Sequence, residues 1–109
     1  MNDLANKKCI PCETGGAPLT REEAQDYLDE VPGWQMNGEA KRISKEYKFR
    51  DFVEAIDFVN RVADIAEMEG HHPDIFVHYN KVRLDLFTHA VSGLSENDFI
   101  LASKIDSHN

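Results

Sequence analysis

The chain has 109 residues, a length typical of one domain and too short for two. Its 12 Lys and Arg residues against 20 Asp and Glu give a net charge of −8, which repels phosphate backbones and argues against direct binding to nucleic acid. No apolar run approaches the ~20 residues that a membrane span needs, so we expect no membrane partner. The N-terminal residues contain no apolar central segment of the kind that a secretory signal has, so we expect a cytoplasmic protein.

Residues 1–18 are polar and interrupted by Gly and Pro, so we expect a flexible N-terminal arm that precedes a single domain at residues 19–107. The arm contains Cys9 and Cys12 in a C-x-x-C spacing, which could be half of a zinc site or a redox pair. A zinc site needs four ligands, and the sequence has no second cysteine pair. A thioredoxin-like motif opens a helix after a strand, whereas this one lies in a polar tail around Pro11. The role of the two thiols stays open.

The first predicted helix begins after Thr20, because Thr20 and Glu23 have the spacing of a capping box. Apolar residues then recur at helical spacing until a Pro-Gly pair ends the helix. A short strand is predicted at residues 34–36, followed by an Asn-Gly hairpin signal. The next strand, at residues 43–49, has mostly apolar residues at odd positions and polar ones at even positions, as expected of a strand with one wet face.

From Asp51 the apolar period changes from two to 3.6, which predicts a long helix with Asp51 as its cap. Gly70 is suited to the left-handed residue that commonly closes a helix. Pro73 also steers His72 away from helical angles, so the helix stops there and a strand begins at about Asp74.

The second predicted hairpin runs from about Asp74 to Thr88, with Asn80-Lys81 as its two-residue turn. After it, Ser95 caps a last helix, and Asp98 occupies the reciprocal capping position. The return strand of the hairpin carries one set of residues on a single face: Val82, Leu84, Leu86 and Thr88.

The order of elements is therefore helix, hairpin, helix, hairpin, helix. Strands that arrive as hairpins between helices favour an antiparallel sheet, with the helices covering one of its faces. The fold class predicted from this order is α+β, as a two-layer sandwich. The other face of the sheet carries several charges, so it is either wet or part of a polar interface.

Three of the five histidines lie at the ends of predicted elements. His71 and His72 lie where the long helix gives way to a strand, and His89 lies at the end of the strand that pairs with it. If residues 79 and 82 flank the turn, His72 lies opposite His89, with His71 one position further out. Imidazole exchanges protons near neutral pH, so this histidine trio suits a reaction in which one proton enters and another leaves.

Glu67, Glu69 and Asp74 could orient or tune the histidine trio, as a carboxylate does in hydrolytic triads. The residues alone leave two other interpretations open. The histidines could be exposed side chains near a helix C-terminus, where the helix dipole favours them. They could also hold zinc or iron together with a carboxylate.

A longer pattern includes the histidine trio and resembles the signature of the pterin-4a-carbinolamine dehydratases. The similarity extends over roughly residues 18–106. The pattern consists, at its family spacing, of Glu67, His71-His72-Pro73, Tyr79, His89 and Asp98.

The resemblance implies a four-stranded antiparallel sheet with three helices on one face, in a homodimer or homotetramer. It implies a lyase that dehydrates 4a-hydroxytetrahydrobiopterin (pterin-4a-carbinolamine) to quinonoid dihydrobiopterin, and so recycles the pterin cofactor of aromatic amino acid hydroxylases. No metal and no organic cofactor takes part in this reaction in the family.

Carried over by position, the histidine trio would be catalytic, with His71 as the principal acid toward the departing hydroxyl and His72 and His89 binding substrate and shuttling protons. Glu67 and Asp98 would orient the imidazoles, although the capping position explains Asp98 equally well. The substrate would be lined by Pro73, Thr88, the backbone at Ala90 and Val91, and the aromatic surface of Trp34.

Two observations limit the resemblance. Animal relatives have Glu and Cys where this chain has Ala90 and Val91, so contact with substrate is expected from the backbone there and not from those side chains. Animal members of the family also bind a homeodomain transcription factor. The alternative function is therefore a non-catalytic interaction module of the transcriptional coactivator kind.

Overall fold

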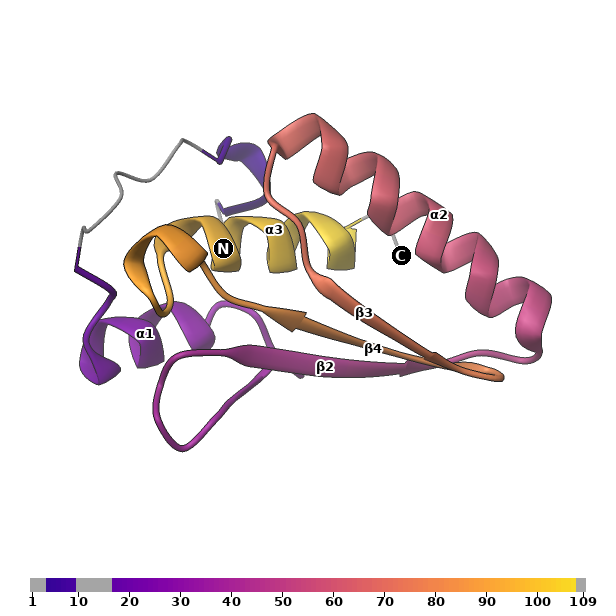
Figure 1. Cartoon of the computed structure of the whole chain (residues 1–109), viewed down its shortest axis with the longest axis horizontal. Coiled ribbons are helices and arrows are strands. Elements are labelled where there is room, and N and C mark those ends of the chain that lie inside the picture. Colours follow the sequence, from indigo (N-terminus) through magenta and orange to yellow (C-terminus); the bar gives the residue numbers. More distant parts are fainter. Residues whose placement is uncertain (1–3, 10–16, 108–109) are drawn as a thin grey trace.

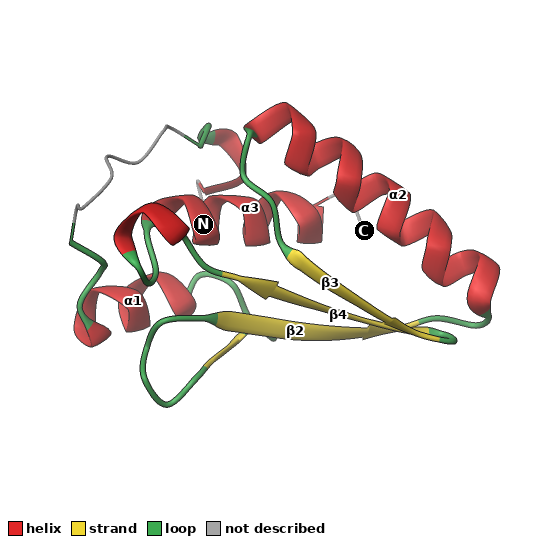
Figure 2. Ribbon diagram, in the orientation of Figure 1, coloured by secondary structure: helices red, strands yellow, loops and turns green. Residues whose placement is uncertain are grey.

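The computed structural model describes residues 4–9 and 17–107, which form an α+β fold with a four-stranded antiparallel sheet (Figures 1 and 2). Helices α2 and α3 cover one face of this sheet, and α1 contacts α3 near the end of the sheet. The elements in chain order are η1 (Leu4–Asn6), α1 (Arg21–Leu28), β1 (Gln35–Met36), β2 (Ile43–Lys48), α2 (Phe52–Glu69), β3 (Asp74–His78), β4 (Lys81–Leu86), η2 (His89–Val91) and α3 (Glu96–Ser107).

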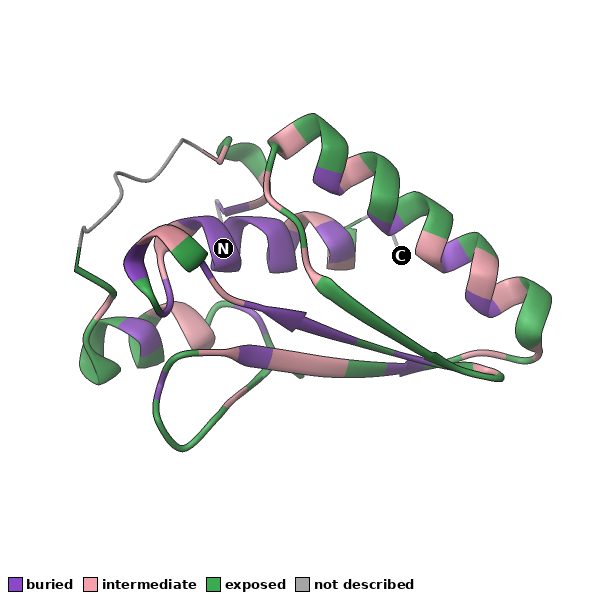
Figure 3. Cartoon of the chain, in the orientation of Figure 1, coloured by how far each residue is buried: buried purple, intermediate pink, exposed green. Residues whose placement is uncertain are grey.

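The core lies between the sheet and the two covering helices (Figure 3). Strand β4 is central in the order β1-β2-β4-β3, and alternate residues of it point into the core, as predicted. Burial of such side chains stabilises the fold by about 1.5–3 kcal/mol each. The largest fully buried side chains include Phe58, Phe99, Ile43, Leu84, Leu86, Leu101 and Ile105. Among the described residues, no helix is both long and apolar enough to cross a membrane.

The predicted starts of α1 and α2 and the predicted end of α2 are confirmed by their hydrogen bonds, whereas α1 ends at Leu28, before the predicted stop at the Pro-Gly pair. The Thr20 hydroxyl accepts from the Glu23 amide at 3.2 Å, and the Glu23 carboxylate accepts from the Thr20 amide at 2.9 Å, which completes a capping box. Asp51 caps α2 by accepting from the Glu54 amide at 2.9 Å. Gly70 closes α2 in the left-handed conformation, with φ 66°.

The predicted turn of the second hairpin is wrong by one residue. The turn consists of Tyr79 and Asn80, and Asp74 therefore pairs with Asp85 instead of Phe87. Two hydrogen bonds hold Asn80 in the turn: its side-chain amide donates to the Phe49 carbonyl at 2.9 Å, and its own carbonyl accepts from the Phe49 amide at 2.8 Å. Tyr79 takes up a positive φ of 54°, which is uncommon for a non-glycine residue.

The N-terminal segment also differs from the prediction of a flexible arm. Residues 4–9 pack against α3, and the side chain of Leu4 is only 2% exposed within the core cluster. Polar contacts fix the segment as well: Lys104 donates to the Ala5 carbonyl at 2.8 Å, and Lys7 pairs with Glu96 at 3.0 Å. This segment therefore belongs to the folded body of the protein.

Candidate active site

His71 and His72 follow the helix end at Gly70 directly. The left-handed Gly70 turns the chain out of α2, while the His71 amide still donates to the Ala66 carbonyl at 3.3 Å. Pro73 then leads into β3. This irregular backbone lets two adjacent side chains serve one hollow, which a regular strand would not allow because successive side chains alternate between faces.

The side chain of His71 is largely buried and is held by Asp98. Its Nε2 lies 2.6 Å from Oδ1 of Asp98, whose side chain is fully buried. An ionised carboxylate only accepts hydrogen bonds, so Nε2 carries the proton of this pair and donates it. The other ring nitrogen, Nδ1, is therefore the atom that His71 can use toward a bound molecule.

Asp98 is both a helix cap and the partner of an imidazole. Its Oδ2 accepts from the Ser95 amide at 3.0 Å, the predicted capping contact, and from the Thr88 hydroxyl at 2.9 Å. Because the Thr88 proton goes to Asp98, the hydroxyl of Ser95, 2.7 Å away, donates to Thr88. The two explanations of Asp98 therefore hold together, and the same carboxylate joins β4's end, α3 and His71.

His72 lies in a more open place. Its Nε2 contacts a carboxylate oxygen of Glu67, one turn back on α2. The side chains are 58% and 77% exposed, so water screens this pair and its contribution to stability is small.

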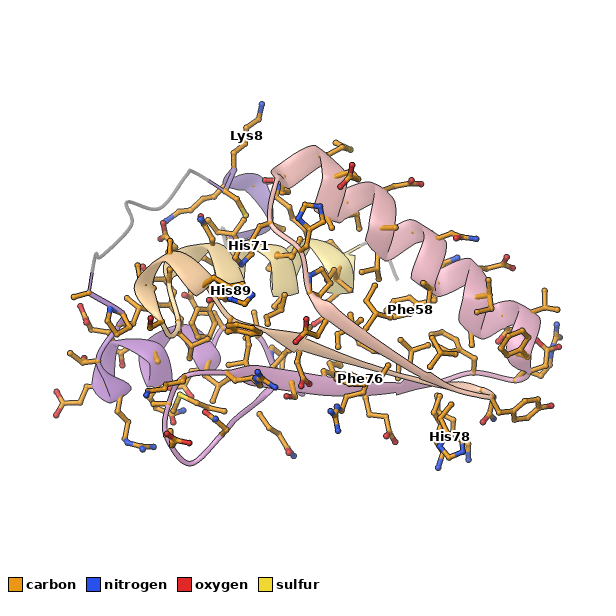
Figure 4. All side chains as sticks on the ribbon, in the orientation of Figure 1. Lys8, Phe58, His71, Phe76, His78 and His89 are labelled. Carbon is orange, nitrogen blue, oxygen red and sulfur yellow. The ribbon has the colours of Figure 1, made fainter. Side chains whose placement is uncertain are left out.

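His89 reaches the site by a route that the sequence analysis did not predict. It is not a cross-strand neighbour of His72, because β4 ends at Leu86 and the chain then forms the 3₁₀ turn η2. A bridge between Thr88 and Gly93 closes this turn, with the Thr88 amide donating to the Gly93 carbonyl at 2.7 Å. Figure 4 shows His71 and His89 near one another and His78 at the far end of the β3–β4 hairpin.

The histidine trio lines one cavity of about 390 Å³. Its walls are residues 70–74, residues 87–90 and Asn97. The predicted residues Pro73, Thr88 and Ala90 belong to these walls. We call this hollow the histidine cavity.

Two predicted substrate-binding residues do not line the histidine cavity. Trp34 is 4% exposed and its indole Nε1 donates to Asp106 on α3 at 3.0 Å, so its ring is part of the core. Val91 is 8% exposed and is not among the residues that line the cavity. A buried indole N–H needs a polar partner, and for Trp34 this partner is Asp106. Neither residue lines the cavity, and the sequence did not indicate that the two would pair.

Phe87 and Asn97 line the cavity but were not singled out from the sequence. The Phe87 ring lies against the imidazole of His89, with ring centroids 4.4 Å apart. One signal for Phe87 was present, since it is an aromatic residue on a strand face that otherwise carries charges. For Asn97 the sequence contained no such signal, because its position in the cavity wall depends on how α3 packs against the end of α2.

Cys9 lies behind the site. Its amide donates to Glu69 at 2.9 Å and its Sγ donates to the Asn97 carbonyl at 3.6 Å. Burial, followed by the nearby charge of Glu69, raises the pKa of the Cys9 thiol to about 12. The thiol therefore stays protonated and is a poor nucleophile or metal ligand near neutral pH. Cys12 lies outside the described residues.

The described ranges, residues 4–9 and 17–107, contain no group of three or more His, Cys, Asp or Glu side chains arranged to hold a metal ion. His71 and His72 each face a carboxylate through Nε2. Two of the three imidazoles thus contact carboxylates, while the His89 ring lies against Phe87.

Comparisons with known proteins match the chain to one family. The model of the family described as Pterin 4 alpha carbinolamine dehydratase matches residues 17–108. A relative from Halorhodospira halophila is 46% identical over 104 residues, which is 95% of each chain. A relative from Nitrosospira multiformis is 48% identical over 107 residues, 98% of this chain and 93% of its own. Both carry the name "Putative pterin-4-alpha-carbinolamine dehydratase".

Solved structures share the fold. A crystal structure described as a transcriptional coactivator/pterin dehydratase from Brucella melitensis has a TM-score of 0.78 and 36% identity, and the match covers 83% of this chain and 96% of that one. A pterin dehydratase-like protein, identified as a RuBisCO assembly factor in the alpha-carboxysome, has a TM-score of 0.60. At 21% identity, over 69% of this chain and 87% of that one, the second likeness concerns the fold alone.

Proposed function

The chain belongs to the pterin 4 alpha carbinolamine dehydratase family, and from this premise we propose that it is an active hydro-lyase. Its substrate would be 4a-hydroxytetrahydrobiopterin and its product quinonoid dihydrobiopterin. The observation that carries the proposal is the gathering of His71, His72 and His89 around one cavity. Fold alone is insufficient support, because a protein named as a RuBisCO assembly factor has the same fold.

The reaction requires two proton movements. The bond between C4a and the hydroxyl oxygen breaks, the oxygen takes up a proton and leaves as water, and the N5 proton departs as N5 forms a double bond to C4a. A well-placed acid or base accelerates such a step by roughly 10²–10⁴. No electron is gained or lost overall, so proton-transfer groups suffice.

We assign the role of principal acid to His71. Asp98 holds its Nε2, which leaves Nδ1 to deliver a proton to the 4a-hydroxyl, and the buried carboxylate balances the positive charge of the ring while it carries that proton. His72 and His89 bind the pterin and move protons between N5 and solvent. The open position of His72 suits exchange with water.

The pterin ring itself would lie against Pro73, Thr88 and the backbone at Ala90, with the Phe87–His89 pair as an aromatic wall. In this assignment neither Trp34 nor Val91 contacts the ring, because both lie outside the lining. The enzyme would be cytoplasmic and would act on the product of a pterin-dependent hydroxylase.

An oligomer is part of the proposal. Strand β3 is an edge strand, and its apolar side chains Ile75, Phe76 and Val77 are 36–45% exposed. An exposed apolar edge favours pairing with a second chain, so we propose a homodimer or homotetramer that covers β3. Sedimentation equilibrium tests this, and a monomer at micromolar concentration would contradict it.

The test of the activity follows the decay of the 4a-hydroxy intermediate in the presence of purified protein. The variant His71→Ala should catalyse the reaction about 10²- to 10³-fold more slowly than the wild-type protein. The matched control is His78→Ala, which removes an exposed histidine at the far end of the hairpin and should leave the rate within about twofold. Wild-type protein that does not accelerate the decay, or a fully active His71→Ala variant, would contradict the proposal.

A further inference from the structure

A second cavity adjoins the first and shares two of its walls. It has a volume of about 440 Å³ and is lined by Phe87 and His89 together with residues of the β1–β2 loop and of the turn after η2. The loop residues that line it are Asn37, Glu39, Lys41 and Arg42. Because Phe87 and His89 line both hollows, a molecule bound beside His89 can extend from one into the other.

The second cavity carries positive charge in a chain whose net charge is −8. Lys41 is 59% exposed, and Glu39 approaches it only to 3.9 Å, so this pair is weak and solvated. Arg42 lies 3.2 Å from Asp85, but the same buried carboxylate also faces Arg83. Two guanidinium groups thus share the Asp85 carboxylate, and the charged residues that line the cavity itself are two cations, Lys41 and Arg42, against one carboxylate, Glu39.

The wall between the cavities is aromatic and cationic at once. The guanidinium carbon of Arg42 lies 4.7 Å from the centroid of the Phe87 ring, and that ring contacts the His89 imidazole. Arg42 is therefore held in place by Asp85 and by Phe87, with 40% of its side chain exposed. The histidine cavity differs in charge, since Asp74 lines it and Glu67 and Asp98 contact its histidines.

The loop that supplies the cations is built by hydrogen bonds of its own. The Asn37 side-chain oxygen accepts from the Lys41 amide at 2.9 Å and from the Arg42 amide at 3.1 Å. Arg21 of α1 donates to the Gly38 carbonyl. The positions of Lys41 and Arg42 are thereby fixed relative to the sheet before any ligand arrives, which reduces the entropic cost of binding.

We propose that this second cavity binds an anionic group on the substituent at C6 of the pterin. The inference rests on the proposed function, because it places the pterin ring against His89. The substrate class would be reduced pterins whose C6 substituent ends in a carboxylate or a phosphate, in preference to pterins with a neutral hydroxylated chain. Lys41 and Arg42 supply the charge, and Phe87 supplies the surface along which the substituent passes.

The test is calorimetric binding with three stable dihydropterins. The neutral probe is 7,8-dihydrobiopterin, the carboxylate probe is 7,8-dihydrofolate, and the phosphate probe is 7,8-dihydroneopterin monophosphate. At low ionic strength, wild-type protein should bind at least one anionic probe about five- to tenfold more tightly than the neutral one, and the difference should shrink at about 0.5 M salt. The better of the two anionic probes identifies the charged group.

Variants locate the effect. Lys41→Gln should reduce the preference for the anionic probe to about two- to threefold or less, and Lys41→Glu should reverse it. The matched control is Lys48→Gln, an exposed lysine at the other end of β2, which should leave the preference unchanged.

Two outcomes overturn the inference. Equal affinity for neutral and anionic probes would overturn it alone, and the dehydratase assay with 4a-hydroxytetrahydrobiopterin would still report on the proposed function. A preference that survives Lys41→Glu would also overturn it. Failure of all three probes to bind, together with no acceleration of dehydration, would contradict the proposed function itself.

Discussion

The carboxylate of Asp98 accepts hydrogen bonds from His71, Thr88 and Ser95, so one buried residue connects three parts of the chain. A change of this carboxylate would remove a hydrogen bond from its partners and would also leave their side chains less well oriented, so it should affect the whole site. The sequence indicated Asp98 twice, once by its capping position and once by the family pattern. It could not show that both contacts are made at the same time.

Replacing Asp98 by Asn should separate orientation from folding. The amide keeps the size of the side chain but has one oxygen for its partners, so either Nε2 of His71 loses its acceptor at Oδ1 or the Ser95 amide and the Thr88 hydroxyl both lose theirs at Oδ2. We expect the catalysed rate to fall by about 10–10³ and the free energy of unfolding to fall by about 1–3 kcal/mol. The rate is measured with the 4a-hydroxy intermediate and the stability by urea unfolding.

Ser95→Ala is the matched control for Asp98→Asn. It removes a hydroxyl from the same network, while the Ser95 amide and His71 keep their contacts with Asp98. It should lower stability by about 1 kcal/mol and leave the rate nearly unchanged. An Asp98→Asn variant with the rate of Ser95→Ala would show that orientation of His71 by this carboxylate does not matter for turnover.

At the scale of elements, the junction after α2 decides where two of the three histidines lie. Gly70 has φ 66°, and no atom lies within 4 Å of the position that a Cβ would occupy there. The requirement for glycine is therefore conformational and not steric. This makes the position a clean test of what a left-handed helix end contributes.

The prediction for this junction compares two variants. Gly70→Ala should cost about 1–2 kcal/mol of unfolding free energy, because alanine must adopt left-handed angles. Gly70→Asn should cost clearly less, because asparagine tolerates this conformation. Urea unfolding measures both. Gly38→Ala is the control, since Gly38 also has open space but no positive φ, and it should change stability by less than about 0.5 kcal/mol. Equal costs for Gly70→Ala and Gly38→Ala would refute the argument.

Most element positions follow from local chemistry in the sequence. The capping residues Thr20 and Asp51 and the closing Gly70 are local signals, and each lies where predicted. The hairpin register does not follow from local signals. It depends on Asn80 bonding to the distant Phe49, and on Tyr79 accepting an unusual backbone angle. The structure places the histidine trio around one cavity, and His89 reaches it by a different geometry from the cross-strand pairing that was predicted.

At the scale of the whole molecule, the N-terminal segment joins the two helices that support the site. Leu4 enters the core, Lys104 of α3 reaches Ala5, and Cys9 contacts Glu69 at the end of α2. Sequence periodicity missed this segment because it is too short to show a period and contributes a single fully packed side chain. Its contacts span up to 99 positions along the chain.

Leu4→Ala should weaken the attachment of the segment without unfolding the domain. A full core Leu→Ala change costs about 2–5 kcal/mol, but a terminal segment can detach alone, which limits the loss to the free energy of its docking. We expect faster amide hydrogen exchange in residues 4–9 and a loss of less than about 2 kcal/mol in global stability. Leu101→Ala, in the middle of α3, is the control and should cost the full amount. A Leu4→Ala variant as unstable as Leu101→Ala would show that the segment unfolds only with the whole domain.

The docking of residues 4–9 onto α3 also fixes an order of events during synthesis of the chain. Ala5 leaves the ribosome long before its partner Lys104, which lies 99 positions later. At about 5–20 residues per second, the segment waits roughly 5–20 s before its binding surface exists. A nascent chain that lacks α3 cannot make this contact, so residues 4–9 can dock only after α3 has been synthesised.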